Sequence, residues 1–169
     1  MHQDYDGYTG EAFSVGERSP LAKINPAAAA RMAIAESLTN LVSADCDSLD
    51  RVVFSANWMA ASGSNIEDQA LFDSVKAIGE DLCPQLGMAI PVGKDSLSMR
   101  TTWREEGKEK SVLSPVSLIA SAFAPVKDVR LTTTPVLQDR EGTVLVLLSL
   151  GGQRLGGSAL AQVCGQLGD

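Results

Sequence analysis

The sequence predicts an α+β fold in which helices flank a mixed or antiparallel sheet. Two long segments have helical periodicity, and five shorter apolar segments have the composition of strands. Segments of the two kinds are interspersed along 169 residues, a length that suits one domain, or one domain and part of another.

The first helix is expected over residues 26–42, because Asn25 is a good N-cap and Pro26 suits the first helical position. Four apolar residues at helical spacing are expected to form its buried stripe: Met32, Ala35, Leu38 and Leu41. A second helix is expected over residues 65–82 and should end at Pro84.

Five apolar segments are expected to be strands: 51–57, 88–92, 97–104, 111–124 and 143–150. The third and fourth are joined across a charged, glycine-containing segment, residues 104–110, which suits either a hairpin tip or a simple solvated turn. Residues 1–24 are punctuated by glycine and proline and are expected to be mostly loop. Another helix is expected to begin at Ser158, after two pairs of glycines that suit either a phosphate cradle or a flexible loop.

Composition excludes several classes of function. The net charge of −7 argues against a general binder of nucleic acid or of anionic membranes. His2 is the one histidine, so a histidine-based triad and a histidine-rich metal site are excluded within this chain. Three widely spaced cysteines fit reduced thiols better than disulfides or zinc, and no signal peptide or membrane span is visible. We therefore expect a soluble, cytoplasmic protein.

A cluster of polar residues follows the predicted strand 88–92, which is expected to stop at Gly93. Its members are Lys94, Asp95, Ser96 and Ser98. A glycine permits close approach, a lysine neutralises phosphate, and carboxylate and hydroxyl oxygens suit magnesium. The cluster predicts either a nucleotide or substrate site or a polar turn between strands, and its glycine spacing does not match a Walker A loop.

Glu36 and Asn40 form a second candidate site on the first predicted helix. They are four residues apart, so their side chains project from the same face. Both offer oxygen ligands of the kind that Mg²⁺ prefers. The alternative is that Glu36 is an ordinary surface residue of an amphipathic helix.

Six segments in order resemble the second half of the synthetase region of the large, single-chain phosphoribosylformylglycinamidine synthases (formylglycinamide ribonucleotide amidotransferases). These segments are 8–11, 16–20, 36–40, 55–60, 82–87 and 91–99. The resemblance covers nearly the whole chain. It implies a fragment of the second synthetase unit, with an N-terminal domain like that of aminoimidazole ribonucleotide synthetase and the start of a C-terminal α/β domain. The implied boundaries are residues 1–130 for the first domain, 131–142 for a connector and 143–169 for the truncated second domain.

The resemblance also implies an activity for the parent protein. The family uses ATP, and ammonia released from glutamine, to convert formylglycinamide ribonucleotide to formylglycinamidine ribonucleotide in purine biosynthesis. Glu36 and Asn40 match positions that hold Mg²⁺ beside ATP or ADP. Lys94, Asp95 and the serines at 96 and 98 match a motif that faces a nucleotide or substrate pocket. The family's catalytic residues have no counterpart in this chain, so the fragment alone is expected to be inactive.

Two alternatives follow from the same motifs. The chain suits a non-catalytic, pseudo-symmetric half that holds a structural Mg-ADP, or a related synthetase of the aminoimidazole ribonucleotide or selenophosphate type. The partners implied are the first synthetase unit and the glutaminase domain of the parent chain. Exposed strands within residues 88–124 are also expected to promote self-association of the fragment.

Overall fold

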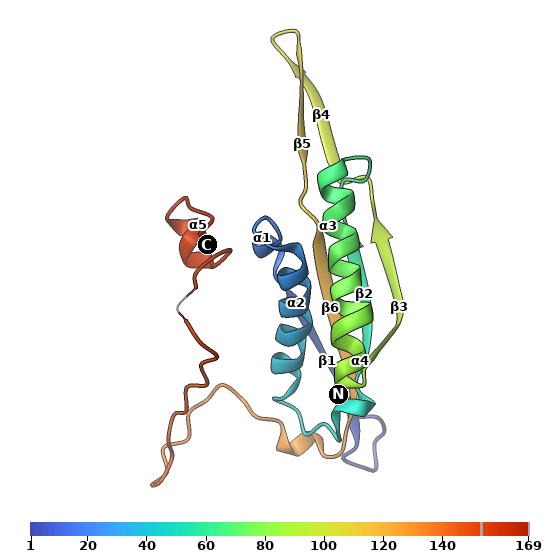
Figure 1. Ribbon diagram of the computed structural model, residues 1–169. Coiled ribbons are helices and arrows are strands. Elements are labelled where there is room, and N and C mark those ends of the chain that lie inside the picture. Colours follow the sequence, from blue (N-terminus) through green and yellow to red (C-terminus); the bar gives the residue numbers. More distant parts are fainter. Residues whose placement is uncertain (153, 169) are drawn as a thin grey trace.

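A computed structural model of the protein describes residues 1–152 and 154–168, and its centre is a four-stranded sheet (Figure 1). The strand order is β1-β6-β2-β3, and the bounds are Gly10–Glu17 for β1, Ser117–Val126 for β6, Val53–Met59 for β2 and Ala89–Ser96 for β3. The β2–β3 pair is parallel, while β6 runs antiparallel to both β1 and β2. The sheet is therefore mixed, and the predicted α+β class is confirmed.

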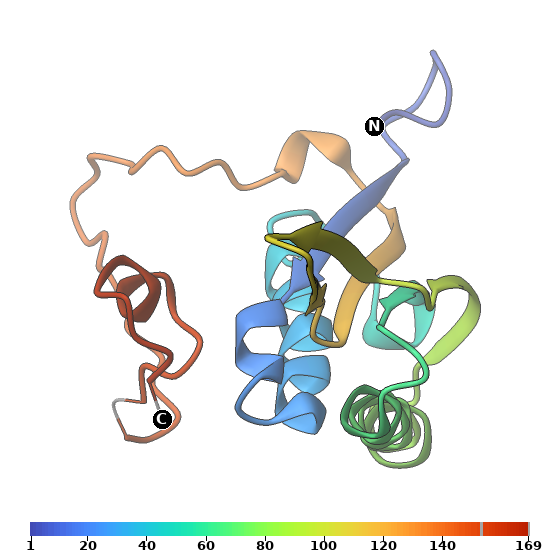
Figure 2. The same cartoon turned by 90° about the horizontal axis from the view of Figure 1, so that it is seen from above.

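Two long helices cover one face of this sheet, as the view from above shows (Figure 2). They are α2 (Pro26–Leu41) and α3 (Asn65–Lys76), and a short helix, α1 (Ser19–Ala22), precedes α2. The Asn25 side chain accepts a 2.9 Å hydrogen bond from the N–H of Ala28, which confirms the predicted N-cap. Among residues 1–152 and 154–168, no helix lies on the opposite face of the sheet (Figure 2).

The core between sheet and helices is built largely from alanine. Along β6 alternate residues point into it, and Ala120 and Ala122 are both 0% exposed. The buried side of α2 has six inner residues: Ala29, Ala30, Ala33, Ile34, Ser37 and Leu41. The predicted stripe is therefore wrong at Met32 and Ala35, which are both exposed. Small side chains let α2 lie close to the strands, so the buried face follows alanine and serine rather than the larger apolar residues.

The second helix is longer than predicted and changes its winding. After α3 comes a π-helical segment, Ala77–Leu82, and then a short helix, α4 (Cys83–Leu86). The N–H of Cys83 donates to the carbonyl of Ile78, five residues back. Pro84 does not end the helix, as had been predicted, because it lies in the first turn of α4, where a missing N–H is tolerated. The helix ends at Gly87, which has a left-handed φ of 65°.

The loop predicted for residues 1–24 and the strand predicted for residues 111–124 need correction. Residues 1–24 are not mostly loop, because they contain β1 and α1. The predicted hairpin is formed by β4 (Arg100–Glu105) and β5 (Lys108–Leu113), and it extends beyond the sheet (Figure 1). The predicted strand 111–124 is divided between β5 and β6, since Pro115 lies between them and has no N–H for a ladder.

The chain after β6 runs away from the sheet to a short helix, α5 (Ala159–Val163) (Figure 1). Ser158 caps α5 by accepting a 3.1 Å hydrogen bond from the N–H of Ala161, which confirms the predicted helix start. The predicted strand 143–150 was wrong: these residues are exposed and pair with no strand that the structure describes. No helix in the described part of the chain has the length and apolar character needed to cross a bilayer.

Candidate functional site

The first candidate site is built where β1 and α2 lie unusually close together, at Gly16. A Cβ atom on Gly16 would lie 2.0 Å from the carbonyl oxygen of Ala33 and 2.5 Å from the amide nitrogen of Ser37. On the same strand, the hydroxyl of Ser14 donates a 2.6 Å hydrogen bond to the carbonyl of Ser37. Because only glycine fits at this crossing, the backbone of β1 comes within reach of polar side chains on α2.

Glu36 and Asn40 are the side chains that meet β1. The Nδ2 of Asn40 donates a 2.9 Å hydrogen bond to the carbonyl of Val15. The N–H of Glu17 donates a 2.9 Å hydrogen bond to Oε2 of Glu36. The guanidinium of Arg18 lies 3.2 Å from Oε1 of the same carboxylate, whose side chain is 29% exposed. The structure therefore brings the predicted pair together, one helical turn apart, and β1 fixes both side chains.

The donor chemistry of this pair fits magnesium in part. Since the amide nitrogen of Asn40 is bonded to Val15, its Oδ1 is left as an acceptor on the face of α2 that also carries Glu36. Mg²⁺ typically takes one or two carboxylates and completes its shell with water and phosphate oxygens. Within residues 1–152 and 154–168, no group of three or more His, Cys, Asp or Glu is placed to hold a metal by itself. The pair therefore suits Mg²⁺ that also binds a phosphate.

An open cleft of about 770 Å³ lies beside this edge of β1. It is bounded by the end of β1, by α1, by the start of β6 and by the segment around α5, and its lining includes Glu17, Ser19, Lys23 and Gly157. A volume of this order is typical of sites for small molecules. The cleft offers a cation, a hydroxyl and a glycine backbone, and Glu17 on its wall is hydrogen-bonded to Glu36.

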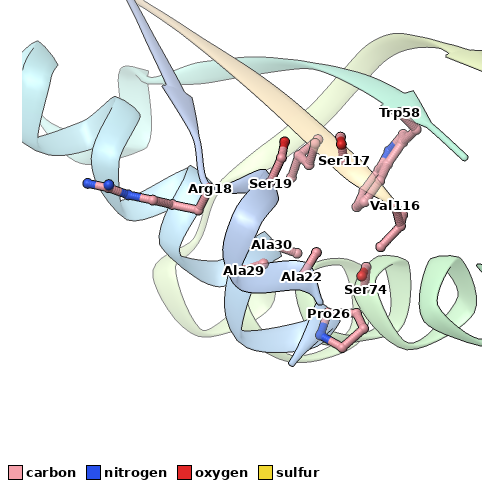
Figure 3. A pocket seen from close by; sticks show the side chains of 11 residues that line it. Arg18, Ser19, Ala22, Pro26, Ala29, Ala30, Trp58, Ser74, Val116 and Ser117 are labelled. Carbon is pink, nitrogen blue, oxygen red and sulfur yellow. The ribbon is translucent and has the colours of Figure 1, made fainter. Parts of the chain in front are cut away.

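A second, much smaller pocket lies under α1 and is shown in Figure 3. It has about 10 Å³ of free space among mostly apolar side chains, including Ala22, Ala29 and Val116. That is room for no more than about one water molecule, so this pocket is part of the packing. In Figure 3 the guanidinium of Arg18 points away from the other labelled side chains of the pocket.

The second candidate site lies on β3, and the strand does not stop at Gly93 as had been predicted. It continues to Ser96, because β2 runs beside it and pairs Asn57 with Lys94 and Met59 with Ser96. A Cβ on Gly93 would lie 2.3 Å from the carbonyl oxygen of Ala56. In this structure the missing side chain of Gly93 therefore allows the close contact between β2 and β3.

The strand divides the predicted polar cluster between two faces. Lys94 and Ser96 share a face, and the amine of Lys94 hydrogen-bonds the hydroxyl of Ser96. Asp95 points to the opposite face, and Ser98 lies beyond the strand, opposite Ala61. An open depression of about 320 Å³ beside β2 and β3 is lined by residues that include Lys94 and Asp95.

Three further polar residues contact or pair with the candidate site residues, although their spacing in the sequence did not identify them. Asn57, paired with Lys94, has a buried Oδ1 with no hydrogen-bond partner in the described structure. Glu17 and Arg18 contact Glu36, although both belong to the motif 16–20. Trp58, beside Asn57, packs against the core cluster, which favours a packing role for that side chain.

The two candidate sites lie at opposite edges of the sheet. Glu36 and Asn40 bond to β1, while Lys94 is on β3, and β6 and β2 lie between them. Three interstrand spacings of about 4.8 Å separate these edges by roughly 14 Å. The chain therefore does not bring the two sets of residues into contact.

Comparison with known protein families decides the relationship. The model of the FGAR-AT PurM_N-like domain matches residues 1–125. The chain belongs to this family. The resemblance stated from the six sequence segments is thereby confirmed, together with the fold class that it implied.

Three solved structures similar to this FGAR-AT PurM_N-like domain come from Thermotoga maritima. Phosphoribosylformylglycinamidine synthase II matches with a TM-score of 0.56 and 17% identity, covering 79% of this chain and 20% of that one. PurL complexed with ATP matches with a TM-score of 0.52 and 18% identity, over 73% and 19% of the two chains. PurLQS matches with a TM-score of 0.50 and 19% identity, over 70% and 18%. At these identities the likeness shows a shared fold, and the chain spans about a fifth of the length of each relative.

Proposed function

We propose that this chain is part of an ATP-dependent, glutamine-using amidoligase that converts formylglycinamide ribonucleotide to formylglycinamidine ribonucleotide. The observation that carries the proposal is the family match over residues 1–125, which includes both Glu36 and Asn40, presented together by α2 and β1. Within the parent, residues 1–130 form the N-terminal-type domain, 131–142 the connector and 143–169 the start of the next domain. The parent is a cytoplasmic enzyme of purine biosynthesis, and the chain alone has no turnover.

In this proposal Glu36 and Asn40 hold Mg²⁺ beside the phosphates of ATP or ADP. The Mg²⁺ supplies charge neutralisation to the phosphates. The cleft beside Glu17, with Lys23 and Gly157 on its walls, supports a nucleotide at this place. The two T. maritima structures described as complexes with ATP and with AMPPCP share the fold, which is consistent with a nucleotide here.

A second candidate function is a non-catalytic half that keeps Mg-ADP to stabilise the fold. The distance of roughly 14 Å between the edges of the sheet favours it, because Lys94 lies at the edge opposite the one where Glu36 would hold a ligand. Among the described residues, Glu36 and Asn40 contact the backbone of β1 and the side chain of Arg18, and none of these is a nucleophile. A bound nucleotide would then contribute stability rather than chemistry.

We assign the polar cluster on β3 to binding the substrate or nucleotide of a neighbouring unit. Lys94 and Ser96 lie on the helix-free face of the sheet, together with the unpartnered oxygen of Asn57. Exposed apolar residues share that face: Phe13, Val15, Val53, Val92 and Phe123. We assign the face to contact with other domains of the parent, the first synthetase unit and the glutaminase domain being the candidates.

The decisive experiment is calorimetric titration with Mg-ADP. We expect Glu36→Gln and Asn40→Ala to weaken binding at least tenfold, since each removes an oxygen ligand or its charge. Glu80→Gln is the matched control, because Glu80 is an exposed glutamate on the same helical layer and its neighbour is Lys76. Equal affinity of all variants would remove Glu36 and Asn40 from any metal role.

The two candidate functions separate in the parent enzyme. If the site is structural, Glu36→Gln lowers the thermal stabilisation by ADP and leaves turnover largely intact. If the site is catalytic, the same change abolishes turnover at unchanged stability. Asp95→Asn is expected to lower synthetase activity and spare glutamine hydrolysis, with Asp73→Asn on α3 as control; full retention of both activities would refute the assignment of residues 93–98.

A further inference from the structure

We propose that Arg18 occupies the cation position at Glu36 when no metal is bound, and that a divalent cation must displace its guanidinium in order to bind. This inference rests on the proposed metal role of Glu36. It assigns to Arg18 a competing and positioning role.

The two carboxylate oxygens of Glu36 contact two consecutive residues, Glu17 and Arg18. The backbone N–H of Glu17 holds Oε2 at 2.9 Å, and the guanidinium of Arg18 lies 3.2 Å from Oε1. The first contact is set by the β1 backbone and survives any change of side chain. The second contact depends on the side chain of Arg18, a residue that lies just outside β1. One carboxylate oxygen of Glu36 is therefore fixed, and the other is exchangeable.

Several features make the Arg18 contact replaceable. The Arg18 side chain is 45% exposed, and exposed ion pairs contribute little because water and salt screen them. Its guanidinium points away from the packed pocket under α1, so the side chain is free to move without opening the core (Figure 3). A hard divalent cation gains more from a carboxylate oxygen than a delocalised guanidinium does.

The displaced guanidinium would remain close to the metal, since its backbone does not move. Two positive charges would then repel each other beside Glu36. The arginine therefore weakens cation binding in two ways, by competing for Oε1 and by like-charge repulsion. Removing its charge should strengthen binding of the metal alone, which is opposite to the effect expected of a residue that merely supports the fold.

The test is a titration with Mn²⁺ alone, in which electron paramagnetic resonance counts the free ion. At low salt we expect Arg18→Gln to lower the Mn²⁺ dissociation constant about three- to tenfold, from the loss of a surface pair and of repulsion. The gain in Mn²⁺ affinity should shrink as NaCl is raised to about 0.5 M, because salt screens both the ion pair and the repulsion. Arg18→Lys keeps the charge and should stay close to the wild type.

Arg31→Gln is the matched control. Arg31 is also on the surface, 44% exposed, and pairs with Asp81 at 3.1 Å, away from Glu36. It should leave Mn²⁺ binding unchanged, while Glu36→Gln should abolish it. If Glu36→Gln binds Mn²⁺ like the wild type, the metal site of the proposed function fails. If Glu36→Gln loses binding but Arg18→Gln leaves the dissociation constant unchanged or raises it, the site stands and displacement is overturned.

Discussion

The backbone N–H of Glu17 donates a 2.9 Å hydrogen bond to the carboxylate of Glu36, 19 residues further along the chain. The donor belongs to the backbone, so the position of β1, rather than any side chain on it, aims the carboxylate. That position depends in turn on Gly16, where β1 and α2 touch. A candidate metal ligand is thus coupled to the packing of a strand against a helix.

The first prediction concerns Gly16. Gly16→Ala would place a methyl group 2.0 Å from the carbonyl oxygen of Ala33, so β1 and α2 must separate. We expect a loss of about 1–3 kcal/mol in the free energy of unfolding, typical of overpacking, measured by urea denaturation. Since the hydrogen bond from Glu17 to Glu36 would lengthen, binding of Mg-ADP should weaken as well.

Gly79→Ala is the control for this change. A Cβ at Gly79 would meet no atom within 4 Å, and the residue is helical, so the variant should be as stable as the wild type or slightly more stable. If Gly16→Ala were equally well tolerated, the close crossing of β1 and α2 would not be a constraint on the site.

Local chemistry made much of this structure predictable. The cap at Asn25, the helix that follows it and the pairing of Glu36 with Asn40 on one face all depend on residues a few positions apart. The strand β1 was missed because its inward residues are small or polar, among them Ser14 and Gly16. The apolar residues that do alternate in β1, Phe13 and Val15, are exposed and lie on the face away from the core.

Long-range pairing explains what the sequence did not reveal. Lys94 and Glu36 were each predicted to lie at a nucleotide or substrate site, and the strand order places them at opposite edges of the sheet. No local pattern fixes strand order, because it depends on contacts between distant segments. The same reason applies to residues 143–150, whose composition suits a strand but which have no partner strand in the described chain.

The second prediction concerns pH and Asp128. A hydrogen bond from the guanidinium of Arg130, which also stacks 3.4 Å from the ring centre of Tyr8, lowers the pKa of Asp128 from 3.8 to about 2. A lowered pKa stabilises the folded protein above pH 3.8, and this contribution is lost as the pH falls towards 2. Asp128→Asn and Arg130→Gln should therefore both flatten the fall in urea midpoint between pH 5 and about 2.5. A wild-type slope in both variants would contradict a stabilising pair.

The third prediction concerns the reactivity of the cysteines. Burial raises the pKa of the Cys83 thiol, which is 6% exposed, and burial followed by the charge of Asp45 raises the pKa of Cys46. Iodoacetamide reacts with thiolates, so at pH 8 it should modify the exposed Cys164 first, Cys46 more slowly and Cys83 last. Peptide mass spectrometry gives the order. In urea the three rates should converge, and rapid labelling of Cys83 in the native protein would contradict its burial.

The fourth prediction concerns the helix-free face of the sheet. Phe13 on β1 and Phe123 on β6 face each other there, with ring centroids 5.1 Å apart, and both are exposed. Uncovered aromatic surface of this kind favours association, so the chain should self-associate when other domains are absent. Phe123→Glu puts a charge in the middle of the face and should shift the protein towards the monomer in sedimentation velocity.

Phe72→Glu distinguishes this face from general surface hydrophobicity. Phe72 is as exposed as Phe13 but lies on α3, on the other side of the molecule, so its substitution should leave the sedimentation distribution unchanged. A monomeric wild type, or equal effects of the two substitutions, would mean that the apolar face is not the contact surface. If Phe123→Glu alone dissociates the protein while its urea midpoint stays within error, the effect is on association and not on folding, and the same residue becomes the first choice for locating the partner domain in the parent chain.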